Sequence, residues 1–176
     1  EHSVCDDILY VNASGYTPID RASIPFGTID PVEGTPFDFT EAKAIGRDID
    51  SDDAQLQVTR GYDHAFRLNK PGRTRRPAAV LCHPGSGRRM TVYTDQPAVQ
   101  VYTANGLNGT LVGKNGIAYP RRSAVCLETM HFSDSPHFRQ FSSYNSRQSN
   151  GHQVNLFQPL YGRFLQSGYL PSVYGL

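Results

Sequence analysis

The sequence predicts an all-β domain built from antiparallel strands, and three observations carry this prediction. Turn-forming residues are frequent, with 16 glycines and 12 prolines among 176 residues. Aromatic side chains are also frequent, with 10 tyrosines and 9 phenylalanines, whereas only 19% of the residues are charged. Short alternating runs of apolar and polar residues follow one another, separated by clusters of turn formers. This pattern is typical of a sandwich or a barrel.

The expected strands follow one another along the chain. The first covers residues 8–12, and residues 15–30 are expected to form an irregular connection because Pro18, Pro25 and Gly27 interrupt them. Residues 39–49 have a helical pattern that Gly46 weakens, and little helix is expected elsewhere. Further strands are expected at 55–59, 78–83, 88–94, 98–103, 123–132 and 152–158, with a hairpin turn at 84–87.

Length, charge and cysteine content narrow the function classes. A chain of 176 residues fits one domain, taken as residues 1–176. With 17 Lys and Arg against 16 Asp and Glu, the net charge of +1 argues against a strongly basic nucleic-acid-binding protein. No apolar run approaches the roughly 18 residues of a membrane span, so no membrane partner is expected. Cys5, Cys82 and Cys126 form no CxxC pair, which favours a reducing, cytoplasmic compartment over a disulfide scaffold.

Three clusters of residues could each form a functional site, and each also has a simpler structural explanation. The acidic run at 48–53 resembles the start of a calcium loop, but Asp53 stands where such a loop has glycine, which favours a solvated acidic loop. Metal binding by Cys82 and His83 is disfavoured because adjacent strand residues point to opposite faces. Clustered arginines could belong to an oligonucleotide-binding barrel, although their positions at turns favour exposed loop tips; they are Arg73, Arg75, Arg76, Arg88, Arg89, Arg121 and Arg122.

One carboxylate stands out in the strand expected at 123–132. Glu128 would share one strand face with Cys126, Met130 and Phe132. It is the only one of the chain's four glutamates in a strand-like run. Burial among apolar side chains would raise its pKa and suit a general base that acts near neutral pH. The alternative, a carboxylate at a strand edge that points into water, is equally compatible with the residues.

Two further positions carry polar groups where a strand favours apolar ones. Gln100 shares a face with an alanine and a tyrosine in the strand expected at 98–103. A buried amide there needs a partner, either a sugar hydroxyl or neighbouring backbone. Asp63 and His64 follow the turn at 60–62, at the entrance of a strand. An acid beside an imidazole in this place could form a site or cap the turn.

Several segments, taken together, resemble the aldose 1-epimerase (galactose mutarotase) family. No single segment is decisive, but all occur in the family's order over residues 8–138. They are Tyr10-Val11-Asn12-Ala13, Tyr16-Thr17-Pro18-Ile19-Asp20, Ile24-Pro25-Phe26-Gly27, Gly34-Thr35-Pro36-Phe37-Asp38-Phe39, Gly61-Tyr62-Asp63-His64, Tyr93-Thr94-Asp95-Gln96-Pro97, Val99-Gln100, Gly113-Lys114-Asn115-Gly116, Cys126-Leu127-Glu128-Thr129, His131-Phe132 and Ser133-Asp134-Ser135-Pro136.

The resemblance implies a fold, a reaction and three site residues. The family's fold is a β-supersandwich of antiparallel sheets with an open sugar cleft. Its members interconvert the α and β anomers of free aldoses such as galactose or glucose by acid/base ring opening, with no metal or organic cofactor. Glu128 matches the family's catalytic base, and Asp63 and Gln100 match residues that hydrogen-bond the sugar. His64 and His131 adjoin these positions and are second-rank candidates.

The sequence departs from the family pattern at both ends. The family's general acid is a histidine in an Asn-His-Ser/Thr-Tyr-Phe/Trp-like motif before the first matched segment, and this motif is not found here. The chain therefore resembles the C-terminal part of the family domain, with an atypical tail at 160–176. One expectation is an epimerase completed by a missing N-terminal half or a second chain. The alternative is a catalytically inactive carbohydrate-binding fragment or paralogue, and an oligonucleotide-binding barrel is a third hypothesis.

Overall fold

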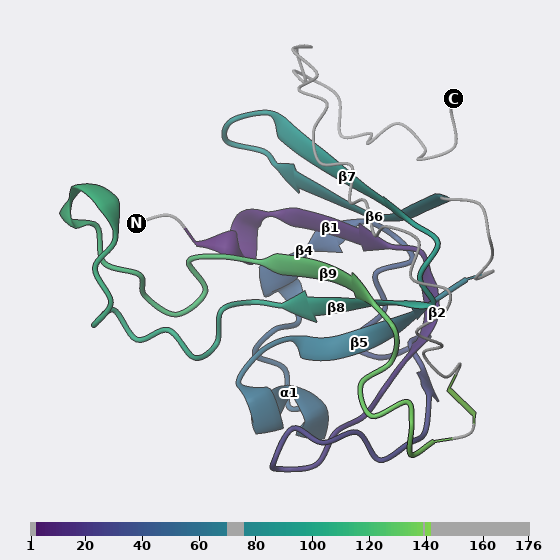
Figure 1. The fold of residues 1–176 in the computed structure, drawn as a ribbon. Helices are drawn as coiled ribbons and strands as arrows, with labels where there is room; N and C mark the ends of the chain where they lie inside the picture. The colour runs from purple at the N-terminus through teal and green to yellow at the C-terminus, as the bar shows by residue number, and fades with distance from the viewer. Residues whose placement is uncertain (1–2, 70–75, 139, 142–176) are drawn as a thin grey trace.

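Two antiparallel sheets pack face to face in the computed structural model, which describes residues 3–69, 76–138, 140 and 141 (Figure 1). One sheet has the strand order β4-β1-β6-β7 and the other the order β3-β2-β5-β8-β9. The strands are β1 (Ile8–Val11), β2 (Ala13–Tyr16), β3 (Asp30–Pro31), β4 (Lys43–Ala44), β5 (Asp63–Leu68), β6 (Arg76–His83), β7 (Arg88–Thr94), β8 (Ala98–Tyr102) and β9 (Cys126–Met130). The helical elements are α1 (Ala54–Thr59) and the 3-10 turns η1 (Val4–Asp6), η2 (Ile45–Arg47) and η3 (Lys114–Gly116).

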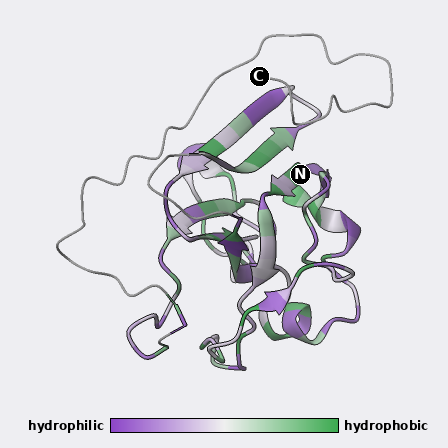
Figure 2. Ribbon diagram, turned by 90° about the vertical axis from the view of Figure 1, so that its right-hand side faces the viewer, coloured by the Kyte–Doolittle hydropathy of each residue, from purple (hydrophilic) through white to green (hydrophobic). Residues whose placement is uncertain are grey.

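The core lies between the two sheets and is built from the alternate residues that each strand turns inward. Leu9 and Val11 of β1 belong to the same buried cluster as Phe66 of β5 and Val99 and Val101 of β8. These five side chains are almost completely removed from solvent. Figure 2 shows hydrophobic and hydrophilic residues succeeding one another along the strands, as a sheet with one buried face requires. Burial of this apolar surface is the main force that holds the sheets together.

The all-β fold class is confirmed, and so are most of the expected strands. The runs expected at 8–12, 78–83, 88–94 and 98–103 correspond to β1, β6, β7 and β8. β6 and β7 form the expected hairpin, with His83 paired to Arg88 on either side of the turn. The run expected at 152–158 and the tail at 160–176 lie outside the described residues.

The strand expected at 55–59 is wrong, because these residues form the helix α1. Asp53 caps this helix: its carboxylate accepts hydrogen bonds from the backbone N–H groups of Gln55 and Leu56 at 2.8 and 3.2 Å. Arg60 ends the helix in the left-handed conformation, with a φ of 59°. Leu56 is buried in the main core. The cap at one end and the left-handed residue at the other therefore decide the conformation of this short segment.

Three other boundaries differ from expectation. Residues 39–49 contain β4 and η2 in place of a longer helix, and β2 begins just before the segment expected to be irregular. β9 is shorter than the run expected at 123–132. It begins late because residues 120–123 form a turn, in which Arg122 has a φ of 65° and the N–H of Ser123 donates to the carbonyl of Pro120 at 3.2 Å.

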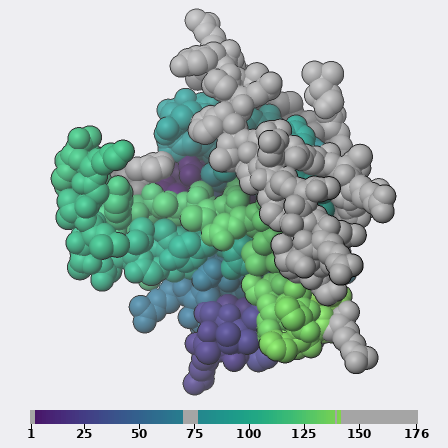
Figure 3. Space-filling model, viewed as in Figure 1, coloured from purple at the N-terminus to yellow at the C-terminus, as the bar shows by residue number. Residues whose placement is uncertain are grey.

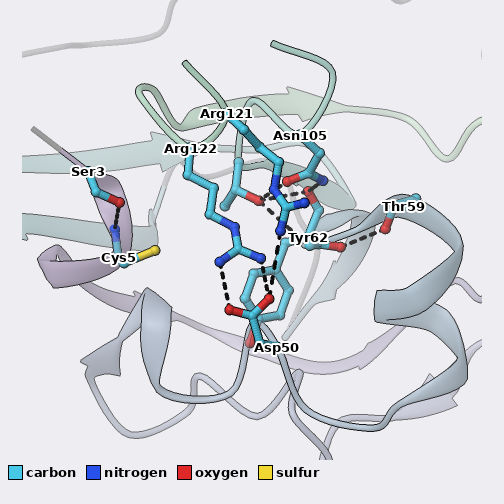
Figure 4. A network of polar contacts seen from close by, with 10 residues as sticks. Ser3, Cys5, Asp50, Thr59, Tyr62, Asn105, Arg121 and Arg122 are labelled. Atoms are coloured by element: carbon cyan, nitrogen blue, oxygen red, sulfur yellow. Dashed lines mark hydrogen bonds and ion pairs between the residues drawn. The ribbon is translucent and has the colours of Figure 1, made fainter. Parts of the chain in front are cut away.

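The acidic run at 48–53 is not simply solvated, since its members hold other segments in place. Asp48 accepts a hydrogen bond from the Lys43 ammonium at 2.7 Å. Asp50 forms a bidentate pair with the Arg122 guanidinium at 2.7 and 2.5 Å, and Arg121 lies 3.7 Å away (Figure 4). The bond from Arg122 holds the pKa of the Asp50 carboxyl below its ordinary value. Two of the clustered arginines thus anchor the connection between β8 and β9.

His64 belongs to the core, and its second-rank candidacy as a site residue is wrong. Its ring packs edge-on against Phe37, with 4.7 Å between centroids, and is 0% exposed. Nδ1 accepts the backbone N–H of Asp63 at 3.2 Å, and Nε2 lies 3.3 Å from Oε1 of Gln55. A backbone N–H can only donate, so Nδ1 is unprotonated and the imidazole is neutral, with Nε2–H facing the Gln55 oxygen. Burial lowers the pKa of His64 to about 3.

Gln55 connects α1 to the loop before β3. Its Oε1 accepts the backbone N–H of Ile19 at 2.7 Å, and its Nε2 donates to the Ile19 carbonyl at 3.1 Å. The same Oε1 faces His64. The side chain of one helical residue therefore fixes both Ile19 and the imidazole behind β5.

No helix in the described part of the chain has the length and hydrophobicity needed to span a membrane.

Replacing Asp53 by alanine should destabilise the protein, because two N–H groups at the start of α1 lose their acceptor. We expect the free energy of unfolding to fall by about 1 kcal/mol. Urea denaturation of Asp53→Ala measures this. Asp52→Ala is the control, because Asp52 is an exposed neighbour of Asp53. It should change the free energy of unfolding by less than about 0.5 kcal/mol. Equal effects of the two substitutions would contradict the capping role.

Burial of neutral His64 should make the protein less stable in acid. The imidazole of the unfolded chain titrates near 6.5, so as the pH falls the unfolded state takes up this proton well before the folded state does. The stability that the neutral imidazole contributes is fully present above about pH 6.5. Below this pH, the free energy of unfolding should fall by up to about 1.4 kcal/mol for each pH unit. Urea denaturation between about pH 7 and pH 5 should show this slope, and His64→Gln should reduce it. The exposed His137→Gln control should retain the slope, and an unchanged slope in His64→Gln would refute the assignment.

Candidate active site

The outward face of the five-stranded sheet brings the site candidates together. Gln100 of β8 pairs with Ala65 of β5 on one side and with Glu128 of β9 on the other. Residues paired across antiparallel strands project to the same face, with Cβ atoms about 5 Å apart. Asp63 lies two residues before Ala65, so its side chain is on this face too. Three neighbouring strands therefore each contribute one of the polar residues singled out in the sequence.

A hydrogen bond joins two of these residues directly. Nε2 of Gln100 donates to Oδ1 of Asp63 at 2.8 Å, and both side chains are half-buried. The partner of the amide is thus a carboxylate on the next strand, not the neighbouring backbone. This bond uses one amide hydrogen and one carboxylate oxygen. The amide carbonyl, its second hydrogen and the other carboxylate oxygen give the pair the capacity to bind hydroxyl groups.

A small cavity of about 100 Å³ lies over this pair. Its wall combines polar and apolar side chains: Thr17, Ile19, Ser23, Pro25, Asp63, Ala65, Gln100 and Ser133. Pockets that enclose whole ligands usually measure at least about 300 Å³. The cavity formed by the described residues is therefore too small to enclose a whole ligand of that kind. The Ile19 side of this wall is the part that Gln55 of α1 holds in place.

Glu128 is exposed, so of the two possibilities left open for it, the carboxylate at a strand edge that points into water is confirmed. The reason is its strand: β9 is the last strand of the sheet, with β8 on one side only among the described residues. Cys126 and Met130, which share its face, are half-buried. Glu128 does not line the cavity itself, but it adjoins Gln100 at the open side of the wall.

The thiol of Cys126 lies beside the carboxylates of the site. Burial raises its pKa, and the negative charges of Glu128 and Asp63 add to the effect. A thiol with a raised pKa stays protonated near neutral pH and is a weak nucleophile and a weak metal ligand. Among the described residues, no group of three or more His, Cys, Asp or Glu side chains is arranged to hold a metal ion.

The other candidates lie elsewhere. His131 directly follows β9 and is half-buried, but it is not in the wall of the cavity. His83 pairs with the buried Asp7, with 2.6 Å between Nδ1 and Oδ1, at the end of the other sheet. The structure thus brings together Asp63, Gln100 and Glu128 on one face, whereas neither His64 nor His131 lines the cavity.

A larger hollow of about 570 Å³ is lined by residues of segment 34–48. Lys43, one of the lining residues, donates to the Pro36 carbonyl at 2.8 Å and to Asp48 at 2.7 Å, and its ammonium lies 4.5 Å from the centre of the Phe39 ring. The Lys43 ammonium therefore already has partners within the protein. None of the site residues predicted from the sequence lines this hollow.

Sequence reasoning missed Gln55 and the hydroxyl groups of the cavity wall. The alternating pattern places Gln55 in a strand, whereas Asp53 as a helix cap places it on a helix. Thr17 and Ser23 fall in the segment expected to be irregular, and Ser133 lies beyond β9. No local pattern marks these three, because only the tertiary fold brings them beside Asp63.

Comparison with known proteins gives a consistent result. The family model described as aldose 1-epimerase matches residues 3–155. Galactose mutarotase of Mus musculus is 42% identical over 139 residues, which cover 79% of this chain and 39% of the relative. Aldose 1-epimerase of Haemophilus influenzae is 37% identical over 148 residues, which cover 84% of this chain and 42% of the relative.

Solved structures agree. The crystal structure of galactose 1-epimerase from Lactobacillus acidophilus superposes with a TM-score of 0.63 and 34% identity, over 72% of this chain and 36% of that chain. An aldose epimerase homologue from C. elegans gives a TM-score of 0.65 at 21% identity, which supports the fold alone. This chain therefore spans about two fifths of the length of the relatives that it matches, with 39% of the first and 42% of the second. The chain belongs to the aldose 1-epimerase family.

Proposed function

We propose that this chain carries the base and part of the sugar-binding wall of an aldose 1-epimerase, which interconverts the α and β anomers of free hexoses such as galactose or glucose. The observation that carries the proposal is the alignment of Asp63, Gln100 and Glu128 across β5, β8 and β9, with Asp63 and Gln100 hydrogen-bonded to each other. Membership of the family supports the reaction class.

In this proposal, Glu128 takes the proton from the anomeric hydroxyl. The electron pair of that O–H bond forms the aldehyde C=O bond, the bond from the anomeric carbon to the ring oxygen breaks, and the ring oxygen gains a proton from an acid. Rotation about the adjoining C–C bond and reversal of these steps give the other anomer. The exposed position of Glu128 at the rim of the wall suits a base that meets a sugar bound on the open face.

Asp63 and Gln100 would hold the sugar so that its reacting carbon lies next to Glu128. A carboxylate and an amide in contact can hydrogen-bond neighbouring hydroxyls of one ring, which fixes the orientation of that ring. The hydroxyl-bearing residues Thr17, Ser23 and Ser133 complete the polar lining of the cavity. The reaction consists of proton transfers and ring opening, so the proposal assigns no residue to a metal or an organic cofactor.

The acid at the ring oxygen is not assigned to a residue of this wall. No histidine is among the described residues that line the cavity, and His64 is neutral and enclosed in the core. The alternative to catalysis is that the chain binds the sugar through Asp63 and Gln100 without converting one anomer into the other. Polarimetry separates the two.

The Glu128 proposal predicts a loss of catalysis on isosteric substitution. Freshly dissolved α-galactose should reach anomeric equilibrium faster with the chain than in buffer, and Glu128→Gln should lower this acceleration by about 10²- to 10⁴-fold, the usual contribution of a general base. Polarimetry follows the decay directly.

Glu33→Gln provides the matched control, because Glu33 is an exposed glutamate outside the cavity wall and should leave the rate unchanged. Equal rates for the wild-type chain and Glu128→Gln, both above the rate in buffer, would refute the base. A wild-type rate equal to that of buffer, together with galactose binding, would favour the non-catalytic alternative.

Substitution of Asp63 by asparagine should weaken sugar binding. The variant keeps the shape of the side chain and its hydrogen bond with Gln100, but the charged acceptor is lost. Hydrogen bonds to charged groups contribute about 1.5–3 kcal/mol, so the Kd for galactose should rise by roughly 10- to 100-fold. Isothermal titration calorimetry measures this. Asp38→Asn, in the larger hollow, should bind galactose like the wild type. Comparable losses in both variants would argue against a specific role of Asp63.

A further inference from the structure

We propose that Asn115 is a site of spontaneous modification, at which the side-chain amide is lost through a cyclic imide and an aspartyl or isoaspartyl residue forms. The proposal concerns the connection between β8 and β9. It does not depend on the sugar site or on the mutarotase activity proposed above.

The chemistry requires an asparagine whose following residue leaves its backbone nitrogen accessible, and glycine does so best because it has no side chain. The glycine nitrogen loses its proton to solvent and attacks Cγ of the asparagine. A C–N bond forms, the bond between Cγ and Nδ2 breaks, and ammonia leaves. Water then adds to one of the two carbonyl carbons of the five-membered imide, which opens to aspartate or isoaspartate. Water is thus the only co-reactant.

Three Asn-Gly pairs fall in the described part of the chain, at 105–106, 108–109 and 115–116, and all three lie in the connection between β8 and β9. A fourth pair, at 150–151, lies outside the described residues. Figure 1 and Figure 3 show the connection standing out from the body of the protein. Because glycine follows the asparagine in each pair, the local structure has to decide which asparagine reacts.

Asn105 is protected on both sides of the reaction. Its Nδ2 donates to the Tyr62 carbonyl at 2.9 Å, and its Oδ1 accepts the Thr103 hydroxyl at 2.7 Å (Figure 4). The attacking nitrogen, that of Gly106, donates to Oη of Tyr102 at 3.1 Å. The side chain and the nitrogen therefore both have to leave hydrogen bonds before the ring can close.

Asn108 is protected in a similar way. Its Oδ1 accepts the backbone N–H and the hydroxyl of Thr110 at 3.0 and 2.6 Å, which holds the side chain on residue 110. The attacking nitrogen, that of Gly109, donates to the carbonyl of Tyr119 at 2.9 Å. Ring closure here would break the pairing between the two sides of the connection.

Asn115 has no such protection. It is exposed, and its side chain makes no hydrogen bond within the described part of the chain. Its backbone is left-handed, with φ 61° and ψ 23°, a conformation that asparagine adopts more readily than most residues. Gly116 is exposed as well, and a Cβ added there would meet no atom within 4 Å. The reacting groups therefore have open space around them.

The turn that contains Asn115 is also weak. η3 is a single 3-10 turn, and such turns have poorer hydrogen-bond geometry than an α-helix. Its closing bond, from the Ile117 N–H to the Lys114 carbonyl, is 3.4 Å long. Just below it, the Gly113 N–H donates to the Ile117 carbonyl at 2.8 Å. Local opening of the tip is enough to bring the Gly116 nitrogen to Cγ.

The products change the tip of the connection. Either product places a carboxylate next to Lys114, and isoaspartate also adds a methylene group to the main chain. The ion pairs of Arg122 and Arg121 with Asp50 hold the other end of the connection against the body, so we expect β8 and β9 to keep their places. An exposed isoaspartyl residue is the kind of substrate that isoaspartyl methyltransferases recognise.

The test follows the folded chain in mildly alkaline buffer without sugar, and peptide mapping by mass spectrometry locates each lost amide. We expect Asn115 to react at least roughly tenfold faster than Asn105 and Asn108, because each of these must first leave several hydrogen bonds. The chain unfolded in urea is the control. There the three sites should react at similar rates, since glycine follows each of them and the hydrogen bonds are gone.

Two variants separate the sites. Asn115→Gln should prevent the reaction at position 115, because glutamine would have to form a less favourable six-membered imide, and should leave the other two sites unchanged. Tyr102→Phe removes the acceptor of the Gly106 N–H and should accelerate the loss at Asn105 about fivefold without affecting Asn115. A purified isoaspartyl methyltransferase should methylate the aged wild-type chain much more than aged Asn115→Gln.

Three results would overturn the proposal. One is a rate at Asn105 or Asn108 in the folded chain that equals or exceeds the rate at Asn115. Another is an intact Asn115 in the folded chain after the unfolded chain has reacted completely. The third is a preference for Asn115 that persists unchanged in urea, because the sequence and not the structure would then be its cause.

Discussion

The antiparallel register of β5, β8 and β9 decides which side chains reach the outward face of the sheet. Gln100 pairs with Ala65 and Glu128, and Asp63 reaches Gln100 across the neighbouring strand. Because side chains alternate along a strand, a slip of one residue would turn the polar face into the core. The register is therefore stabilised by the same burial that closes the sandwich: Phe66, Val99 and Val101 occupy the inward positions between the site residues.

The core and the candidate site are also connected through α1. Gln55 holds the backbone of Ile19 in the cavity wall and faces His64, whose ring packs against Phe37. The wall is thus supported from behind by a neutral imidazole and a helix that Asp53 caps. Polar groups of this kind need their partners because a buried donor or acceptor without one is costly. The position of the cavity wall consequently depends on residues that do not touch the cavity.

Much of the fold could be predicted from alternation and turn residues. β1, β6, β7 and β8 have clear apolar patterns, and the hairpin at 84–87 has the glycines and proline of a turn. α1 could not be found by alternation, because six residues with a single buried leucine resemble a strand until the cap at Asp53 is considered. The residues around Glu128 left burial and exposure equally open, and only the strand order shows that β9 lies at an edge of the sheet among the described residues. The meeting of Asp63 and Gln100, 37 residues apart, was expected from the family resemblance and not from local pattern.

The central claim is that a sugar binds the outward face of β5, β8 and β9. Amide chemical shifts measured while galactose is added to the full chain test this claim most directly, since they locate binding without requiring catalysis. The account predicts that the largest changes cluster at Asp63, Gln100 and Glu128 and their strand neighbours, and that β6 and β7 change little. Changes centred on the larger hollow around Lys43, or no saturable change at all, would contradict it.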